Sequence, residues 1–325
     1  MTGVQTCALP ISAGSGRGGG RGGAPLTPEQ QNSLERGGTI YAELCYSCHG
    51  ADGRGTPTPG AAAGAVLASS LAGSARVNGH RDYVIKTLLH GLSGPVDGKV
   101  YPQVMVAMGS NKDEWIADVT SHVRNSFGNA GPLATMQDVA RVRAATGDRK
   151  TPWTVGELDA SLPRPLVPDA SWKITASHEG RPAPQANAEG GYNFIGNAAG
   201  ALTFLGWTTG VPQQAGMWFQ IGLPAPAIVT EMQFTSSPVG GGRSGSPPAW
   251  TFPRSYQVQV SADGNAWSAP VAEGQGAPGT TVITFAPVSA TFVRITQTAT
   301  VNDAPAWSMR LLRLYQAPVS PGGPR

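Results

Sequence analysis

The pentapeptide Cys45-Tyr46-Ser47-Cys48-His49 sets the strongest limit on what this chain can become. Its two thiols stand about one helical turn apart, and the histidine directly follows the second of them. This spacing is the signature for covalent haem attachment, in which both cysteines bond to the vinyl groups and the histidine reaches the iron. The pattern occurs once in the sequence, so we expect one haem c, held by Cys45 and Cys48, with His49 as an iron ligand.

Two other kinds of site also use paired cysteines. A structural zinc ion usually takes four protein ligands, and without Cys7, discussed below, only two thiols remain. A redox-active Cys-x-x-Cys motif is expected within a βαβ unit, and the flanking sequence does not have that pattern. We therefore favour haem over zinc or a redox disulfide.

A haem iron with one histidine needs a sixth ligand or keeps an open site. Residues 101–109 contain Met105 and Met108 just before an expected helix. A thioether from either residue would bind the iron opposite His49, and His/Met ligation raises the reduction potential. The alternative is that these methionines only fill the core. Because these methionines follow a haem motif in the sequence, we favour ligation of the iron by one of them.

The N-terminal residues need separate treatment. Residues 1–12 read MTGVQTCALPIS and resemble a translated sequencing adapter. They lack the basic start and the continuous apolar run of a secretory signal. We expect Cys7 to carry no chemistry and the natural start, with any export signal, to be missing. Residues 13–26 form a glycine-rich linker.

The region around the pentapeptide is predicted to be helical. Thr27 suits an N-cap, Pro28 suits the first helical position, and Gln30 can complete a capping box. Apolar spacing and acidic residues in first turns predict the other helices. These are expected at residues 81–90, from Asn111 to Gly128, and at residues 135–145. We therefore place a helical domain at residues 27–130 and a linker with one short helix at residues 131–169.

The remainder of the chain has the pattern of an all-β sandwich, which we place at residues 170–316. Asp263-Gly264-Asn265 is a hairpin-turn signal between two apolar runs. The expected strands are residues 218–221, 228–235, 256–261, 280–285 and 291–296. Residues 317–325 form a tail rich in proline and glycine.

Residues 28–128 resemble a class I cytochrome c domain of bacterial extracytoplasmic systems. The resemblance rests on three stretches: Cys45–Gly55, Leu89–Tyr101 and Val123–Asn129. It implies that Cys45 and Cys48 bind haem, with His49 as the proximal ligand and Met105 as the distal one. Met108 is the fallback, because Val106 stands where relatives often have proline after the ligand methionine.

Three histidines outside the pentapeptide are not expected to bind iron. His122 stands where relatives often have an aromatic residue, and we expect it to pack against Gly37 and Gly38. His80 and His90 flank the second helix, and we interpret both as surface or hydrogen-bonded side chains.

Residues 170–316 resemble a discoidin-like domain, the coagulation factor 5/8 type C group with a galactose-binding-like fold. The carrying stretches are Trp172–His178, Trp207–Gly210, Gly216–Ile221, Tyr256–Gly264, Phe292–Thr296 and Leu312–Tyr315. Such domains bind sugars, lipids or proteins through variable loops. We expect Trp207 and Trp218 in the core, and Trp250 and Phe252 as exposed aromatic residues. Calcium is doubtful, because Ile195-Gly196-Asn197 and Leu311-Leu312 lack the carboxylates that this ion prefers.

Composition narrows the function further. Charged residues make up 13% of 325 residues, the net charge is +3, and no basic block or long apolar run occurs. Nucleic-acid binding and a membrane span are therefore not expected. We favour a periplasmic or extracellular electron carrier, tethered by the β domain to a glycan or a partner such as a dehydrogenase or respiratory chain. The alternatives are a haem enzyme with an open iron site and a glycan-binding surface protein, so enzyme activity stays uncertain.

Overall fold

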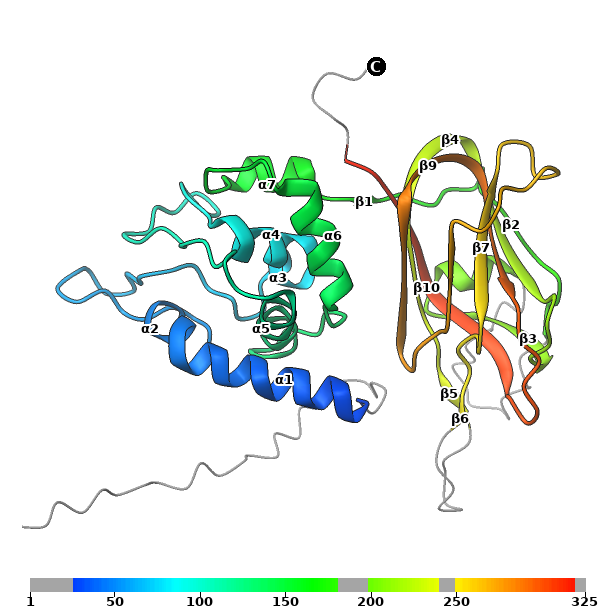
Figure 1. Cartoon of the computed structure of the whole chain (residues 1–325), viewed down its shortest axis with the longest axis horizontal. Helices are drawn as coiled ribbons and strands as arrows, with labels where there is room; N and C mark the ends of the chain where they lie inside the picture. The colour runs from blue at the N-terminus through cyan, green and yellow to red at the C-terminus, as the bar shows by residue number, and fades with distance from the viewer. Residues whose placement is uncertain (1–25, 181–197, 240–248, 319–325) are drawn as a thin grey trace, which may run out of the picture.

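The computed structural model describes residues 26–180, 198–239 and 249–318. A helical part precedes an antiparallel β part, and the two lie side by side (Figure 1), which confirms the predicted fold class. The adapter-like residues 1–12 with Cys7, most of the glycine-rich linker and the turn Ile195-Gly196-Asn197 lie outside the described residues.

The helical part is built from short helices joined by long loops. In chain order they are α1 (Pro28–Ile40), a π-helical turn (Tyr41–Cys45), α2 (Tyr46–His49), α3 (Ala75–Asn78), α4 (Asp82–His90), α5 (Asp113–Asn125), α6 (Met136–Thr146) and α7 (Val155–Ser161). The capping box predicted at Thr27 is present, because Thr27 and Gln30 exchange side-chain and backbone hydrogen bonds. Helix α5 ends at Asn125 rather than at Gly128, because both Phe127 and Gly128 take positive φ angles of 58° and 80°.

Helices α1 and α5 cross at the glycine pair. Gly37 is buried against the backbone of Asp118, and a Cβ on Gly38 would lie 3.2 Å from a carbon of the His122 ring. The His122 ring also packs against Tyr41, with 5.6 Å between ring centroids. The prediction that His122 packs on this pair is therefore confirmed.

Residues 131–169 hold two helices rather than one short helix. Val139 and Val142 of α6 and Leu158 of α7 are fully buried in the same core as the preceding helices. Trp153 joins this core, and its backbone N–H donates to the Gly91 carbonyl at 3.0 Å. Most of the segment therefore belongs to the helical fold, whereas Leu166 near its end packs against the core of the sandwich.

The β part is an antiparallel sandwich around a single core. Its strands are β1 (Arg164–Pro165), β2 (Lys173–Ala176), β3 (Trp207–Pro212), β4 (Trp218–Thr235), β5 (Pro238–Val239), β6 (Ala249–Trp250), β7 (Tyr256–Ser261), β8 (Ala272–Gly274), β9 (Thr280–Gln297) and β10 (Ala306–Gln316). The main order is β1-β10-β4-β9-β7-β8, with β2 on β4 and β3 on β10. Two long strands each join two of the expected strands, with an irregular register between them. Strand β4 contains residues 218–221 and 228–235, and β9 contains residues 280–285 and 291–296.

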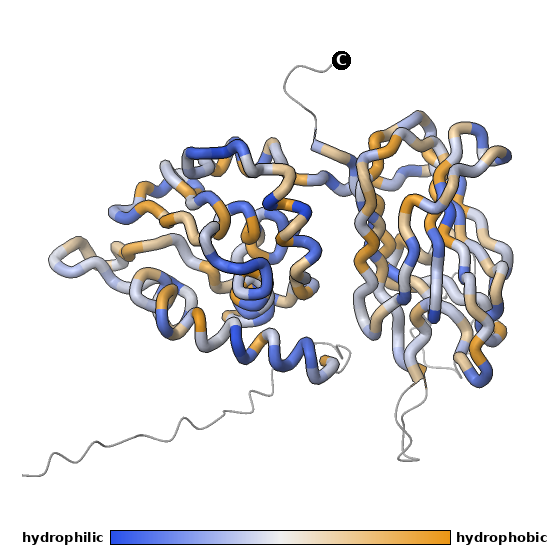
Figure 2. Tube along the Cα trace, in the orientation of Figure 1, coloured by the Kyte–Doolittle hydropathy of each residue, from blue (hydrophilic) through white to orange (hydrophobic). Residues whose placement is uncertain are grey.

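The sandwich core is apolar and contains Trp207, which is 2% exposed, as predicted. Trp218 is instead half-buried and lies beside the Arg294 guanidinium, whose carbon is 4.7 Å from the ring centroid. Figure 2 shows apolar and polar residues interspersed along the strands of the sandwich. Among the described helices, none combines the length and apolar character needed to cross a bilayer.

Candidate functional site

The pentapeptide lies at the junction of two helical turns. Cys45 closes the π-helical turn, and Cys48 and His49 belong to α2. Both cysteines are free thiols and partly buried. Gly50 ends α2 with a φ of 75°, and its N–H donates to the Tyr46 carbonyl at 2.8 Å. This backbone turn places both thiols and the imidazole on the same short segment, as the spacing predicted.

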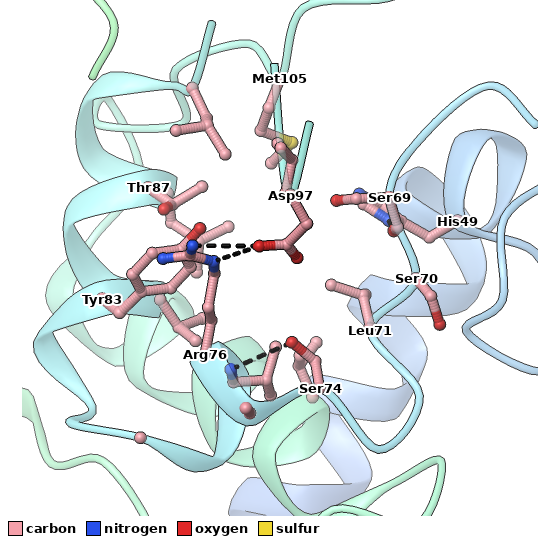
Figure 3. A pocket seen from close by; sticks show the side chains of 18 of the residues that line it. His49, Ser69, Ser70, Leu71, Ser74, Arg76, Tyr83, Thr87, Asp97 and Met105 are labelled. Carbon is pink, nitrogen blue, oxygen red and sulfur yellow. Dashed lines mark hydrogen bonds and ion pairs between the residues drawn. The ribbon is translucent and has the colours of Figure 1, made fainter. Parts of the chain in front are cut away.

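Cys45, His49 and Met105 line one cavity of about 680 Å³ inside the helical part. Its volume falls within the roughly 300–1,000 Å³ that is typical of cofactor and ligand pockets. Figure 3 shows His49 and Met105 on different walls of this cavity, on segments far apart in sequence. Leucine and valine side chains supply much of the remaining wall.

The His49 ring is held in one orientation. Its Nδ1 lies 3.2 Å from the Ser69 carbonyl oxygen, so Nδ1 carries the hydrogen and donates to that oxygen. The other ring nitrogen, Nε2, is then the one with a free lone pair. Burial lowers the pKa of His49, which favours the neutral form that binds metals.

The cysteine environment disfavours a thiolate. Burial, and to a lesser degree the neighbouring Cys48, raises the pKa of Cys45 to about 11. A buried thiol of this kind stays protonated near neutral pH, unlike the activated cysteine of a redox motif. An uncharged thioether suits the same apolar surroundings.

The two methionines differ in position. Met105 pairs with Leu92, each backbone N–H donating to the other carbonyl at 3.0 Å. A Cβ on Gly91 would lie 2.5 Å from the Met105 carbonyl oxygen, so only glycine allows this close approach. Met105 lines both the main cavity and an adjoining one of about 450 Å³, whereas Met108 lines only the adjoining one.

Exposed apolar side chains surround the adjoining cavity. Leu44, Val100, Val104 and Val106 are all exposed and all line it, together with both cysteines. We call these four residues the apolar rim. Exposed apolar side chains that gather at the edge of a cavity often mark an interaction surface, and motif reasoning did not identify this one.

A polar group lines another side of the main cavity. Arg76 of α3 binds Asp159 of α7 at 2.7 Å. It also binds Asp97 at 3.0 Å, and its guanidinium carbon lies 5.8 Å from the centroid of the Tyr83 ring (Figure 3). Sequence reasoning missed this group. The only local signal was the capping box formed by Thr154 and Glu157 at the start of α7.

The aromatic residues that the sequence suggested as a binding surface of the sandwich are less exposed than predicted. Trp250 and Phe252, expected to be exposed, are half-buried, and the Arg254 guanidinium carbon lies 4.1 Å from the Phe252 ring centroid. Phe204 is 63% exposed and is the most exposed aromatic residue among those described in the sandwich. Across the described ranges, no group of three or more His, Cys, Asp or Glu side chains is placed to hold a metal ion.

The residues present fit a covalently bound haem. One free thiol (Cys45), an oriented neutral imidazole and a thioether line a largely apolar cavity of suitable volume, and the second free thiol (Cys48) lines the cavity that adjoins it. Residues 34–127 match the family model described as Cytochrome c. Cytochrome c-552 of Thermus thermophilus is 35% identical over 115 residues, covering 33% of this chain and 84% of that relative. This chain belongs to the cytochrome c family.

Membership of this family implies covalent haem c. The cytochrome c-552 of the Thermus thermophilus strain ATCC 27634 is also 35% identical over 115 residues, covering 74% of that relative. Residues 173–312 match the family model described as F5/8 type C domain. The chain is thus a cytochrome c electron carrier joined to a region that matches the F5/8 type C domain.

Several solved structures resemble the sandwich of this cytochrome. One is CpGH89CBM32-5 from Clostridium perfringens in complex with GalNAc-β-1,3-galactose, with 19% identity, 45% of this chain and 95% of that chain covered, and a TM-score of 0.32. Another is the family 32 CBM from C. perfringens NanJ in complex with galactose, with 18% identity, 45% and 95% covered, and a TM-score of 0.30.

Proposed function

We propose that this cytochrome carries one electron at a time through a single haem, bound by Cys45 and Cys48, with His49 and Met105 as axial ligands. The observation that carries the proposal is that Cys45, His49 and Met105 line one cavity although Met105 is distant in sequence. When bound, the haem supplies reversible one-electron chemistry.

The chain's own residues would prepare the site for that chemistry. The Ser69 carbonyl holds the His49 ring, and the Met105–Leu92 backbone pair fixes the loop that carries the thioether. The apolar walls exclude water, which favours the form of the haem with the lower net charge. The apolar rim offers a partner a contact surface beside both cysteines.

The ligand assignment is tested by spectroscopy on protein matured with its haem. We expect the oxidised protein to show the far-red band of Met–iron ligation and the reduced protein not to bind carbon monoxide. Met105→Ala should abolish the band, and Met108→Ala, the matched control, should keep it. The reverse result would assign Met108. Carbon monoxide binding by the unmodified protein would instead support an enzyme with an open iron site.

We further propose that the sandwich binds a glycan and so positions the electron carrier. The support is its F5/8 type C family match and the exposed ring of Phe204, because exposed aromatic rings stack on sugar rings. On a glycan array, we expect the whole protein to bind and Phe204→Ala to bind at least tenfold more weakly. Phe252→Ala is the control. Loss of glycan binding in the Phe252 variant alone would place the site at the segment around Phe252. If the whole protein bound no glycan, docking on a protein would be favoured.

We also propose a periplasmic or extracellular location, with a dehydrogenase or a respiratory chain as redox partner. Covalent haem attachment in this family implies an extracytoplasmic compartment. The apolar rim predicts that partner binding depends little on salt, because few charges would be screened. Fractionation of the native host with staining for covalent haem tests the location, and haem in the cytoplasmic fraction alone would contradict it.

A further inference from the structure

A buried ionic cluster joins the two domains of this cytochrome. Arg81, at the start of α4, lies 2.8 Å from the Glu231 carboxylate of β4 and 2.7 Å from that of Asp138 in α6. The side chains of Arg81 and Glu231 are each 2% exposed. The ion pair between Arg81 and Glu231 therefore lies out of water, where charge interactions are strong.

The helical side of this cluster has more positive than negative groups. Its arginines are Arg81, Arg124 and Arg141, and its acids are Asp82 and Asp138. Among the described residues, no carboxylate lies within ion-pair distance of Arg124, which instead donates to the Gly79 and Pro132 carbonyls at 3.0 and 3.1 Å. Glu231 is the sandwich's acid in this cluster, and it compensates the excess.

The cluster touches the wall of the haem cavity. His80 lines that cavity, and its Nε2 lies 3.4 Å from the Glu231 carboxylate. The ring of His80 also packs edge-on against Tyr315 of β10, with 5.5 Å between centroids. Gly79, whose carbonyl accepts from Arg124, lines the cavity as well. One side of segment 79–80 thus faces the haem site while the other meets the sandwich.

We propose that Glu231 of the F5/8 domain tunes the haem and lowers its reduction potential. The inference rests on the proposed haem site. A buried negative charge stabilises the ferric state, which has one more positive charge than the ferrous state, and solvent ions screen it poorly. Glu231 is 126 positions or more from every residue that we assign to the haem. It is nevertheless the group through which the sandwich acts on the electron carrier.

The test is redox titration of the whole haem-loaded protein in mildly alkaline buffer, above the range in which imidazoles usually titrate. Glu231→Gln should shift the midpoint potential to a more positive value. Glu231→Asp keeps the negative charge but moves it away from His80. Its midpoint potential should therefore also shift to a more positive value, by less than in Glu231→Gln. Glu273→Gln, which changes an exposed acid on β8, is the matched control and should leave the potential unchanged.

The visible spectrum separates this inference from the proposed haem site. A normal haem spectrum in every variant, with no shift or a negative shift for Glu231→Gln, would overturn the role of Glu231. If Glu231→Gln does not fold, Glu231→Asp carries the test, and an unchanged potential in that variant would also overturn it. Unmodified protein that lacks covalent haem would contradict the proposed function instead.

Discussion

Gly37 of α1 lies against the backbone carbonyl of Asp118 of α5, with no room between them for a side chain. The two helices are also tied by side chains at this crossing. Arg36 donates to the Asp118 carboxylate at 3.0 Å, and Ser33 donates to it at 2.6 Å. The glycine therefore sets how closely α1 approaches α5.

We expect Gly37→Ala to destabilise the helical domain by roughly 1–3 kcal/mol, because the added methyl would overpack this crossing. Denaturant unfolding followed at the haem band measures the loss. Gly156→Ala is the matched control, since a Cβ there would meet nothing within 4 Å. An equal loss in both variants would show that the close approach is not the cause.

We expect Leu158→Ala to cost about 2–5 kcal/mol, as is typical when a fully buried leucine is truncated. The residue belongs to α7, which lies beyond the part of the chain matched to the cytochrome family. Thermal unfolding of the helical domain is the measurement, with the exposed Val167 changed to alanine as control. A Leu158 variant as stable as this control would mean that α7 does not support the fold.

The interdomain cluster predicts a loss of stability in acid. Burial alone would raise the pKa of Glu231, but His80 and Arg81 outweigh it and lower the pKa from 4.5 to about 2. The carboxylate's stabilising contribution is thus complete above pH 4.5 and disappears as the pH falls towards 2. Asp82 and Asp138 also have lowered pKa values, so they add to the same trend.

We therefore expect the unfolding free energy of the unmodified protein to fall between pH 4.5 and about 2. In Glu231→Gln the slope should be shallower by up to about 1.4 kcal/mol per pH unit, the equivalent of one proton. Chemical denaturation at a series of pH values measures both slopes. Identical slopes would refute the contribution of this carboxylate.

Arg294 is predicted to stabilise the sandwich by stacking between two tryptophans. Its guanidinium carbon lies 4.7 Å from the ring centroid of Trp218 and 3.9 Å from that of Trp267. Such contacts are worth about 0.5–2 kcal/mol, so Arg294→Leu should lower the stability of the F5/8 domain by a similar amount. Tryptophan fluorescence during urea unfolding is the measurement. Lys173→Ala, an exposed change on β2, should have no effect, and a similar loss there would contradict the stacking role.

Local chemistry explains which features the sequence could predict. The capping box at Thr27 and the strand Tyr256–Ser261 depend on near neighbours, and both occur as predicted. The pentapeptide also acts within a single turn, so its placement followed from spacing. Met105 lines the cavity wall, and its role as an iron ligand stays a prediction.

Contacts between distant segments explain what the sequence could not predict. Nothing near Glu231 or Arg81 in the sequence shows that they meet, because the contact forms only when the two domains pack. The long strand β4 continues past Pro224 and Pro226, which usually end strands, by shifting register between Gly222 and Ala227. Helix α7 was missed because seven residues are too few for a clear apolar period.

The end of the helical domain that carries α2 points away from the sandwich (Figure 1). A molecule attached to a solid support through its F5/8 domain would therefore present its electron-exchanging end to the liquid. On an electrode coated with a ligand of the F5/8 domain, direct electron transfer from the protein to the electrode would give only a weak current. A small dissolved redox mediator would restore the current. The architecture keeps the proposed glycan-binding domain and the helix α2 on different sides of one molecule.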